Sequence, residues 1–202
     1  VNRSLQAFLN QRLWWREIER HDQPHINSLL PFDDQRKVTG YALARERLLD
    51  RGRPNYAHIS RRYRWLKEAY RRPAEKEGLN DVFKNFSKHM AEDLFEINRI
   101  SNGWIDSARS VLASVERSGG VNLIVGADKL IPTLAKLYMY RMNAIFPPEN
   151  VYSAAKMGKA WCFKQIVQQY GQSITYVAVG GSGVEKTLRL SAQNVQLYPI
   201  RV

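Results

Sequence analysis

The chain has 202 residues, with 31 Lys and Arg against 19 Asp and Glu, and therefore a net charge of +12. Hydrophobic residues make up 44% of it and aromatic residues 11%, which excludes a wholly disordered chain and suffices for one or two packed domains. A single cysteine and the lack of a long apolar run exclude an intrachain disulfide, a multi-cysteine zinc site and a membrane span. Because so basic a chain usually meets an acidic partner, nucleic acid is the first partner class to consider.

The first part of the chain has the periodicity of helices. Apolar residues recur there at spacings of three and four, which places them on one helical face. Proline and glycine end these patterns at Pro73 and at Gly119 and Gly120. We therefore predict an all-helical domain over residues 1–118, and its helical segments are 5–18, 41–50, 59–70, 82–97 and 104–115.

The pattern changes after Gly120. Short runs rich in β-branched residues indicate buried strands, and helical patterns separate them. Strands that alternate with helices in this way pair in parallel. We predict an α/β portion over residues 119–202. Its strands are 121–125, 150–153, 174–179 and 195–200, and its helices are 130–137, 159–170 and 184–191.

The positive charge is concentrated in the helical part. Residues 1–72 carry 16 Lys and Arg against 8 Asp and Glu, which is +8 of the total +12. Arginine forks suit phosphates and can stack on bases, so this surface is a candidate RNA-binding site. The alternative is that Tyr63, Leu66 and Tyr70 face the core and the arginines form a solvated face. The candidate RNA-binding residues are Arg36, Lys37, Arg61, Arg62, Arg64, Lys67, Arg71 and Arg72.

Three segments of the second part resemble the Eyes absent phosphatases of the haloacid dehalogenase (HAD) superfamily. They are residues 122–134, 149–163 and 176–185, which are similar to the second, third and fourth motif regions of that family. Residues 62–70 and 103–112 resemble helices of the family's inserted domain. The resemblance implies an α/β fold: half of a HAD-like parallel Rossmannoid sheet, with a large all-helical inserted domain that acts as a cap.

The resemblance also implies a phosphatase centre, most of which this sequence lacks. No apolar strand followed by Asp-X-Asp precedes Val121, so the first strand and its nucleophile are missing. Gly126 stands at the second-motif Thr position, and Gly181 and Ser182 stand where the fourth motif has its metal-binding Asp. Only Lys159 matches its motif. Because the losses at 126 and 181–182 lie inside the chain, we predict a degenerate centre with no catalytic residues, Lys159 being a relict.

The sequence therefore predicts a non-catalytic pseudophosphatase. By analogy, we expect a structural protein of a large RNA-containing assembly, the mitochondrial ribosome, that contacts rRNA and neighbouring proteins through its basic half. No metal, cofactor, small-molecule substrate or membrane contact is expected. The alternative is an Eyes absent-type Mg²⁺-dependent protein phosphatase or transcription cofactor, nuclear or cytoplasmic, whose nucleophile strand lies outside these 202 residues. Because that strand is central in the family's sheet, we expect residues upstream of Val1 or a neighbouring chain to fill its place.

Overall fold

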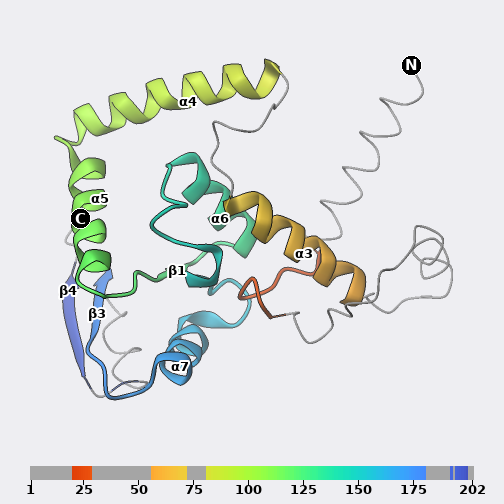
Figure 1. The fold of residues 1–202 in the computed structure, drawn as a ribbon, viewed down its shortest axis with the longest axis vertical. Helices are drawn as coiled ribbons and strands as arrows, with labels where there is room; N and C mark the ends of the chain where they lie inside the picture. The colour runs from red at the N-terminus through yellow and green to blue at the C-terminus, as the bar shows by residue number, and fades with distance from the viewer. Residues whose placement is uncertain (1–19, 29–55, 72–80, 181–191, 193, 200–202) are drawn as a thin grey trace, which may run out of the picture.

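The computed structural model describes residues 20–28, 56–71, 81–180, 192 and 194–199 (Figure 1). Its helices are α3 (Tyr56–Arg71), α4 (Asp81–Ile100), α5 (Trp104–Arg117), α6 (Leu130–Met139) and α7 (Gly158–Tyr170), with a 3₁₀ turn, η2, at Pro148–Asn150. Its strands are β1 (Ile124–Gly126), β2 (Val151–Ser153), β3 (Tyr176–Gly180) and β4 (Val195–Pro199). The helices predicted at 5–18, 41–50 and 184–191 lie outside the described residues.

The described elements follow the predicted order of helices and strands. The main difference is at β1, which begins at Ile124 rather than at Val121. The side chain of Asn122 donates a hydrogen bond to the Leu112 carbonyl at 2.8 Å, and Asn150 donates to the Asn122 carbonyl at 2.9 Å. These bonds hold the predicted start of the strand against α5 and η2 rather than in a ladder.

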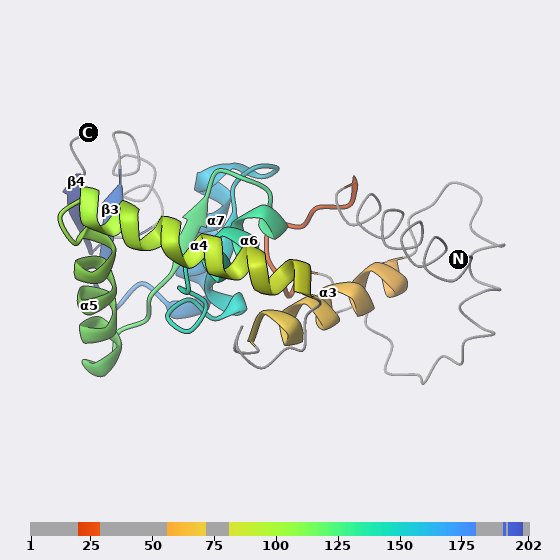
Figure 2. The ribbon, with the colours of Figure 1, turned by 90° about the horizontal axis from the view of Figure 1, so that it is seen from above.

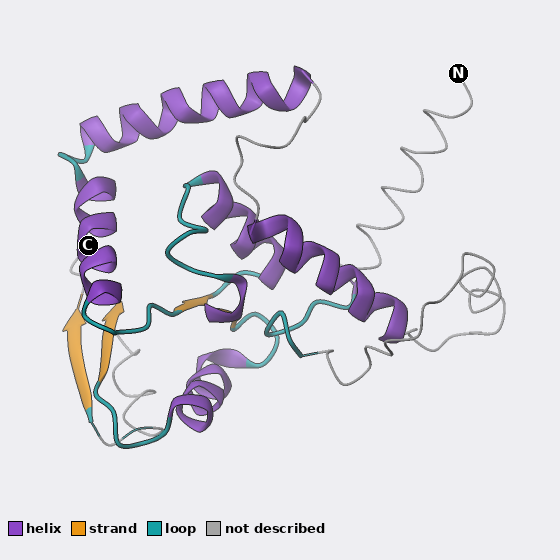
Figure 3. Cartoon of the chain, viewed as in Figure 1, coloured by secondary structure: helices purple, strands orange, loops and turns teal. Residues whose placement is uncertain are grey.

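The strands form two separate parallel pairs, β1 with β2 and β3 with β4. Figure 3 shows the two long arrows of β3 and β4 side by side. Ile124 to Gly126 of β1 align with Val151 to Ser153 of β2, and β3 aligns with β4 from Tyr176 opposite Val195. The prediction of parallel strands is confirmed, but the single half-sheet is divided in two. The outer edge of β2 is covered by residues 20–28, through an antiparallel bridge between His25 and Tyr152. Such cover protects a strand edge from unwanted pairing.

Two apolar cores hold these elements together. In the first, Tyr63 and Tyr70 of α3 are buried with Leu130 and Leu134 of α6 and with Val151 of β2. This core joins residues on both sides of position 118, and the predicted domain division there stays a prediction. The second core surrounds α7 and draws on both strand pairs. Its members and close neighbours include Val125, Tyr152, Cys162, Phe163, Ile166, Val167, Tyr176, Ala178 and Val195.

Helices α4 and α5 form an arm with an apolar surface. Their corner is made by Asn102 and Gly103, which both have positive φ, and the Asn98 side chain accepts a hydrogen bond from the first turn of α5. Figure 2 shows α4 lying across the molecule, with α5 turning away at its end. Phe95 and Trp104 are more than 60% exposed on this arm. No helix in the described part of the chain is long and apolar enough to cross a membrane.

Candidate functional site at the carboxyl ends of the strands

The end of β1 is packed closely against the side chain of Thr133. A Cβ atom on Gly126 would lie 2.9 Å from Thr133 Oγ1 and 3.1 Å from Thr133 Cγ2. Thr133 is itself buried and donates a hydrogen bond to the Lys129 carbonyl at 3.0 Å. The hydroxyl that the sequence lacks at position 126 therefore cannot be restored without moving Thr133, because the space is occupied.

The loop between β1 and α6 is fixed by hydrogen bonds from both sides. Ser153, at the end of β2, donates from its fully buried hydroxyl to the Asp128 carbonyl at 2.8 Å. Asp22 Oδ1 accepts a bond from the backbone N–H of Leu130 at 3.1 Å, at the first residue of α6. An acidic residue in this place satisfies an unpaired amide and complements the helix dipole. Asp128, two residues before the start of α6, pairs with Lys136 instead.

Asp22 was not among the predicted functional residues. It is 7% exposed, and its Oδ2 atom has no hydrogen-bond partner among the described residues. Burial raises the pKa of this carboxyl, while the Leu130 amide and the charges of Lys129 and Lys156 act against that rise. No local pattern around residue 22 signals this role, because the partner lies in a helix far along the chain.

Of the relict motif residues, Lys159 lies in the first turn of α7 with an exposed side chain. Gly181 and Ser182 lie outside the described residues, directly after β3. Parallel strands place their carboxyl ends on one edge of a sheet, and ligands of open α/β sheets bind there. The ends of β1 and β2 and the start of α7 are thus the candidate site, and the family resemblance adds the end of β3, which lies in the other strand pair.

The basic helix α3 has two of its cations engaged in ion pairs. Lys67 Nζ lies 2.7 Å from Glu149 Oε1, and Arg71 pairs with the same carboxylate. Burial raises the pKa of Glu149, but its bond to Lys67 and the charges of Lys67 and Arg71 outweigh that effect and lower the pKa. Tyr63 and Tyr70 face the core, as the alternative interpretation of this helix requires.

The rest of the predicted RNA-binding set is placed only in part. Arg61 and Arg62 are half-buried on α3, and Arg64 is exposed. Arg36, Lys37 and Arg72 lie outside the described residues. The structure therefore brings five of these cations onto one helix, and RNA contact by them stays a prediction.

The chain has known relatives among the protein phosphatases. No protein-family model matches it. It is 26% identical to human protein phosphatase EYA3 over 204 aligned positions, which cover 93% of this chain and 35% of the relative. It is 30% identical to mouse protein phosphatase EYA1 over 190 positions, which cover 86% of this chain. Against a chicken protein phosphatase EYA3 sequence it is 37% identical over 81 positions, 40% of this chain and 68% of that sequence. The chain belongs to the Eyes absent family.

The Eyes absent assignment confirms the resemblance noted in the sequence motifs. The chain spans about a third of the length of the human and mouse relatives, at 35% and 32%. The mixed α/β structure with parallel strands fits a fragment of the HAD-like domain of this family.

The Eyes absent family also implies a magnesium ion, and the described residues do not fit one. Mg²⁺ is held by oxygen ligands, among them one or two carboxylates. In the part of the chain that the structure describes, no three His, Cys, Asp or Glu side chains come together. Asp128, the carboxylate nearest in sequence to the end of β1, is exposed and paired with Lys136.

Proposed function

We propose that this chain is part of an Eyes absent-type protein phosphatase domain whose nucleophile strand is supplied by residues outside these 202. The observation that carries the proposal is the division of the strands into two parallel pairs that share one core over α7. Each pair contributes side chains to that core, so both lie against the same helix. A further parallel strand between β1 and β3 would join the pairs into one sheet.

Such a strand would deliver its carboxyl end to the candidate site. It would end beside Gly126 and the end of β3, which is where the family resemblance implies an aspartate nucleophile. Lys159, in the first turn of α7, offers positive charge at the same edge, where it can offset the charge of a phosphoryl group. This role is consistent with its exposed side chain.

The proposal is tested by phosphatase assays of the full-length protein with an aryl phosphate. Replacing Lys159 by Met should lower kcat/KM by about a hundredfold, the typical effect of one electrostatic group on a transition state. Lys164→Met is the matched control, because Lys164 is an exposed lysine on the same helix. Equal activity of the two variants would refute the role of Lys159 and weaken the phosphatase assignment.

The second candidate is a non-catalytic member of the family that contacts RNA through its basic helical half. The tight packing of Gly126 against Thr133 favours it, because the second-motif position is built into the fold without a hydroxyl. Mitochondrial location and membership of a ribosome belong to this candidate as predictions. Its test is binding of single-stranded RNA by the full-length protein, which should weaken steeply with salt as counterions are released. Salt-independent binding, or none, would contradict it.

A further inference from the structure

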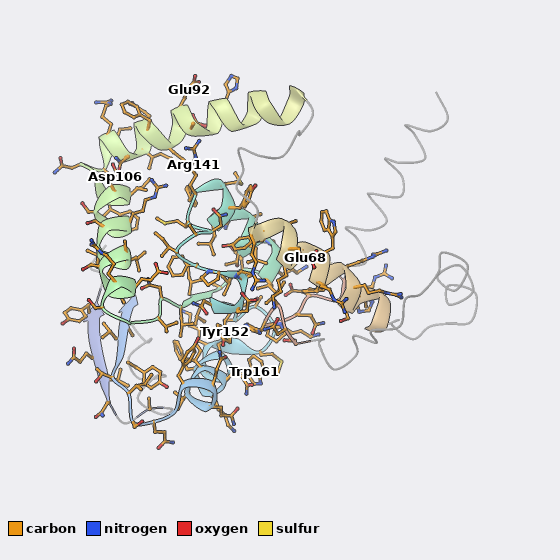
Figure 4. The ribbon with its side chains drawn as sticks, viewed as in Figure 1. Glu68, Glu92, Asp106, Arg141, Tyr152 and Trp161 are labelled. Carbon is orange, nitrogen blue, oxygen red and sulfur yellow. The ribbon has the colours of Figure 1, made fainter. Side chains whose placement is uncertain are left out.

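A pocket of about 380 Å³ lies between residues 25–28 and α7. Its walls include the rings of His25, Tyr152 and Trp161 and the side-chain amides of Asn27, Gln165, Gln168 and Gln169. Figure 4 shows Tyr152 and Trp161 on this side of the molecule, by α7. The size is within the range of small-ligand pockets, which are mostly apolar with a few oriented polar groups.

The rings of this pocket are held in place and are uncharged. His25 and Tyr152 stack with ring centroids 4.6 Å apart. His25 Nε2 lies 2.8 Å from the carbonyl oxygen of Glu149 and donates a hydrogen bond to it. His25 Nδ1 accepts a hydrogen bond from the backbone N–H of Asn27. Burial lowers the pKa of His25, which keeps the ring neutral. No Asp, Glu, Lys or Arg is among the described residues that line the pocket. A phosphate group therefore has no cationic partner in these walls.

The amides form a row on α7. The Tyr152 hydroxyl donates to Gln169 Oε1 at 2.9 Å, and Gln165 Nε2 donates to Gln168 Oε1 at 3.0 Å. Both bonds use the carbonyl oxygens of Gln168 and Gln169. Among the described residues, the Nε2 groups of these two side chains have no hydrogen-bond partner, so they can donate to a ligand. Asparagine and glutamine amides are suited to pair with the edges of nucleobases.

Positive charge begins at the edge of the pocket. Lys67 Nζ donates to Asn27 Oδ1 at 3.0 Å, so α3 meets the pocket wall at this bond. Arg64 and Arg71 lie three residues before and four after Lys67, which places them on the same helical face. A neutral ring-lined pocket therefore adjoins a helix rich in arginine.

We propose that this pocket accepts one unstacked nucleobase of a single-stranded RNA whose phosphates run along α3. The base stacks on an aromatic ring of the pocket and takes hydrogen bonds from the glutamine amides. The phosphates lie outside, on the side of Arg64 and Arg71. This inference deepens the second candidate function, on which it rests, and does not depend on phosphoryl transfer.

The test is fluorescence anisotropy of the full-length protein with a labelled ten-nucleotide RNA and, separately, with heparin, a polyanion without bases. Trp161→Ala and Gln168→Ala should each weaken RNA binding on the order of tenfold and leave heparin binding unchanged. Arg64→Ala should weaken both. The matched controls are Trp104→Ala and Gln172→Ala, which replace exposed residues of the same types outside the pocket.

Three results would overturn the inference. The first is RNA binding that neither pocket variant changes. The second is an equal loss of RNA and heparin binding in Gln168→Ala, an exposed position where loss of folding is not expected. The third is a mononucleotide that binds as tightly as the RNA, which would assign the pocket to a free nucleotide. If the first result occurs and RNA binding still weakens with salt, the pocket is refuted and the second candidate function stands.

Discussion

Asp22 accepts a hydrogen bond from the backbone N–H of Leu130, 108 positions further along the chain, at 3.1 Å. This bond joins residues 20–28 to the start of α6 beside the candidate site. We predict that Asp22→Ala lowers the free energy of unfolding by about 1–2 kcal/mol, as for the loss of a helix cap. Urea unfolding of the full-length protein measures it, with the exposed Asp93→Ala as control. Equal stability of the two variants would show that the cap contributes nothing.

The same carboxyl predicts a pH dependence of stability. Burial raises the pKa of Asp22 above 3.8, so the folded state holds its proton more tightly than the unfolded state. Its contribution to stability is fully present below pH 3.8 and is lost as the pH rises through the folded pKa. Asp22→Asn, which keeps the acceptor, should therefore gain stability relative to the native protein as the pH rises above this range. A difference that is constant with pH would contradict the raised pKa.

The pKa of Glu149 predicts a pH dependence of stability that is opposite to that of Asp22. Although burial acts to raise its pKa, Lys67 and Arg71 lower it below 4.5, so its contribution is present above that pH and is lost as the pH falls through the folded pKa. We expect Glu149→Gln to cost about 1 kcal/mol at pH 7 and less in acid, since both partners remain partly exposed. Chemical unfolding at neutral pH and in acid measures the change. If the loss of stability in Glu149→Gln were larger in acid than at pH 7, this result would contradict the lowered pKa of Glu149.

The contact between Gly126 and Thr133 predicts coupling between two substitutions. Gly126→Ala should destabilise the protein by about 1–3 kcal/mol, because the new Cβ atom overpacks the site. In a Thr133→Ala background the same change should cost much less, since the crowding atoms are gone. The comparison is a double-mutant cycle on unfolding free energies. If Gly126→Ala cost the same free energy of unfolding in both backgrounds, the crowding against Thr133 would be refuted.

The sequence was sufficient for the helices α3 to α7 and the four strands that the structure describes, and for the family. Apolar spacing predicts α3 to α7, and runs of β-branched residues predict the strands, because these signals are local. It was not sufficient for the contacts that fix the site. Asp22 and Leu130 are 108 positions apart, and Arg71 and Glu149 are 78 apart, so no local pattern relates them. The sequence likewise shows that α3 is basic, but it does not show that Lys67 and Arg71 share one carboxylate.

We propose that this chain serves a phosphatase domain completed by a strand from outside it. The most direct measurement is aryl phosphate hydrolysis by the full-length protein as Mg²⁺ is titrated, for the native sequence and for Ser182→Asp. We predict turnover that requires Mg²⁺ in the native protein, and a lower Mg²⁺ requirement in Ser182→Asp, because a carboxylate returns to the fourth-motif position. Turnover no higher than background in both proteins at every Mg²⁺ concentration would contradict the account.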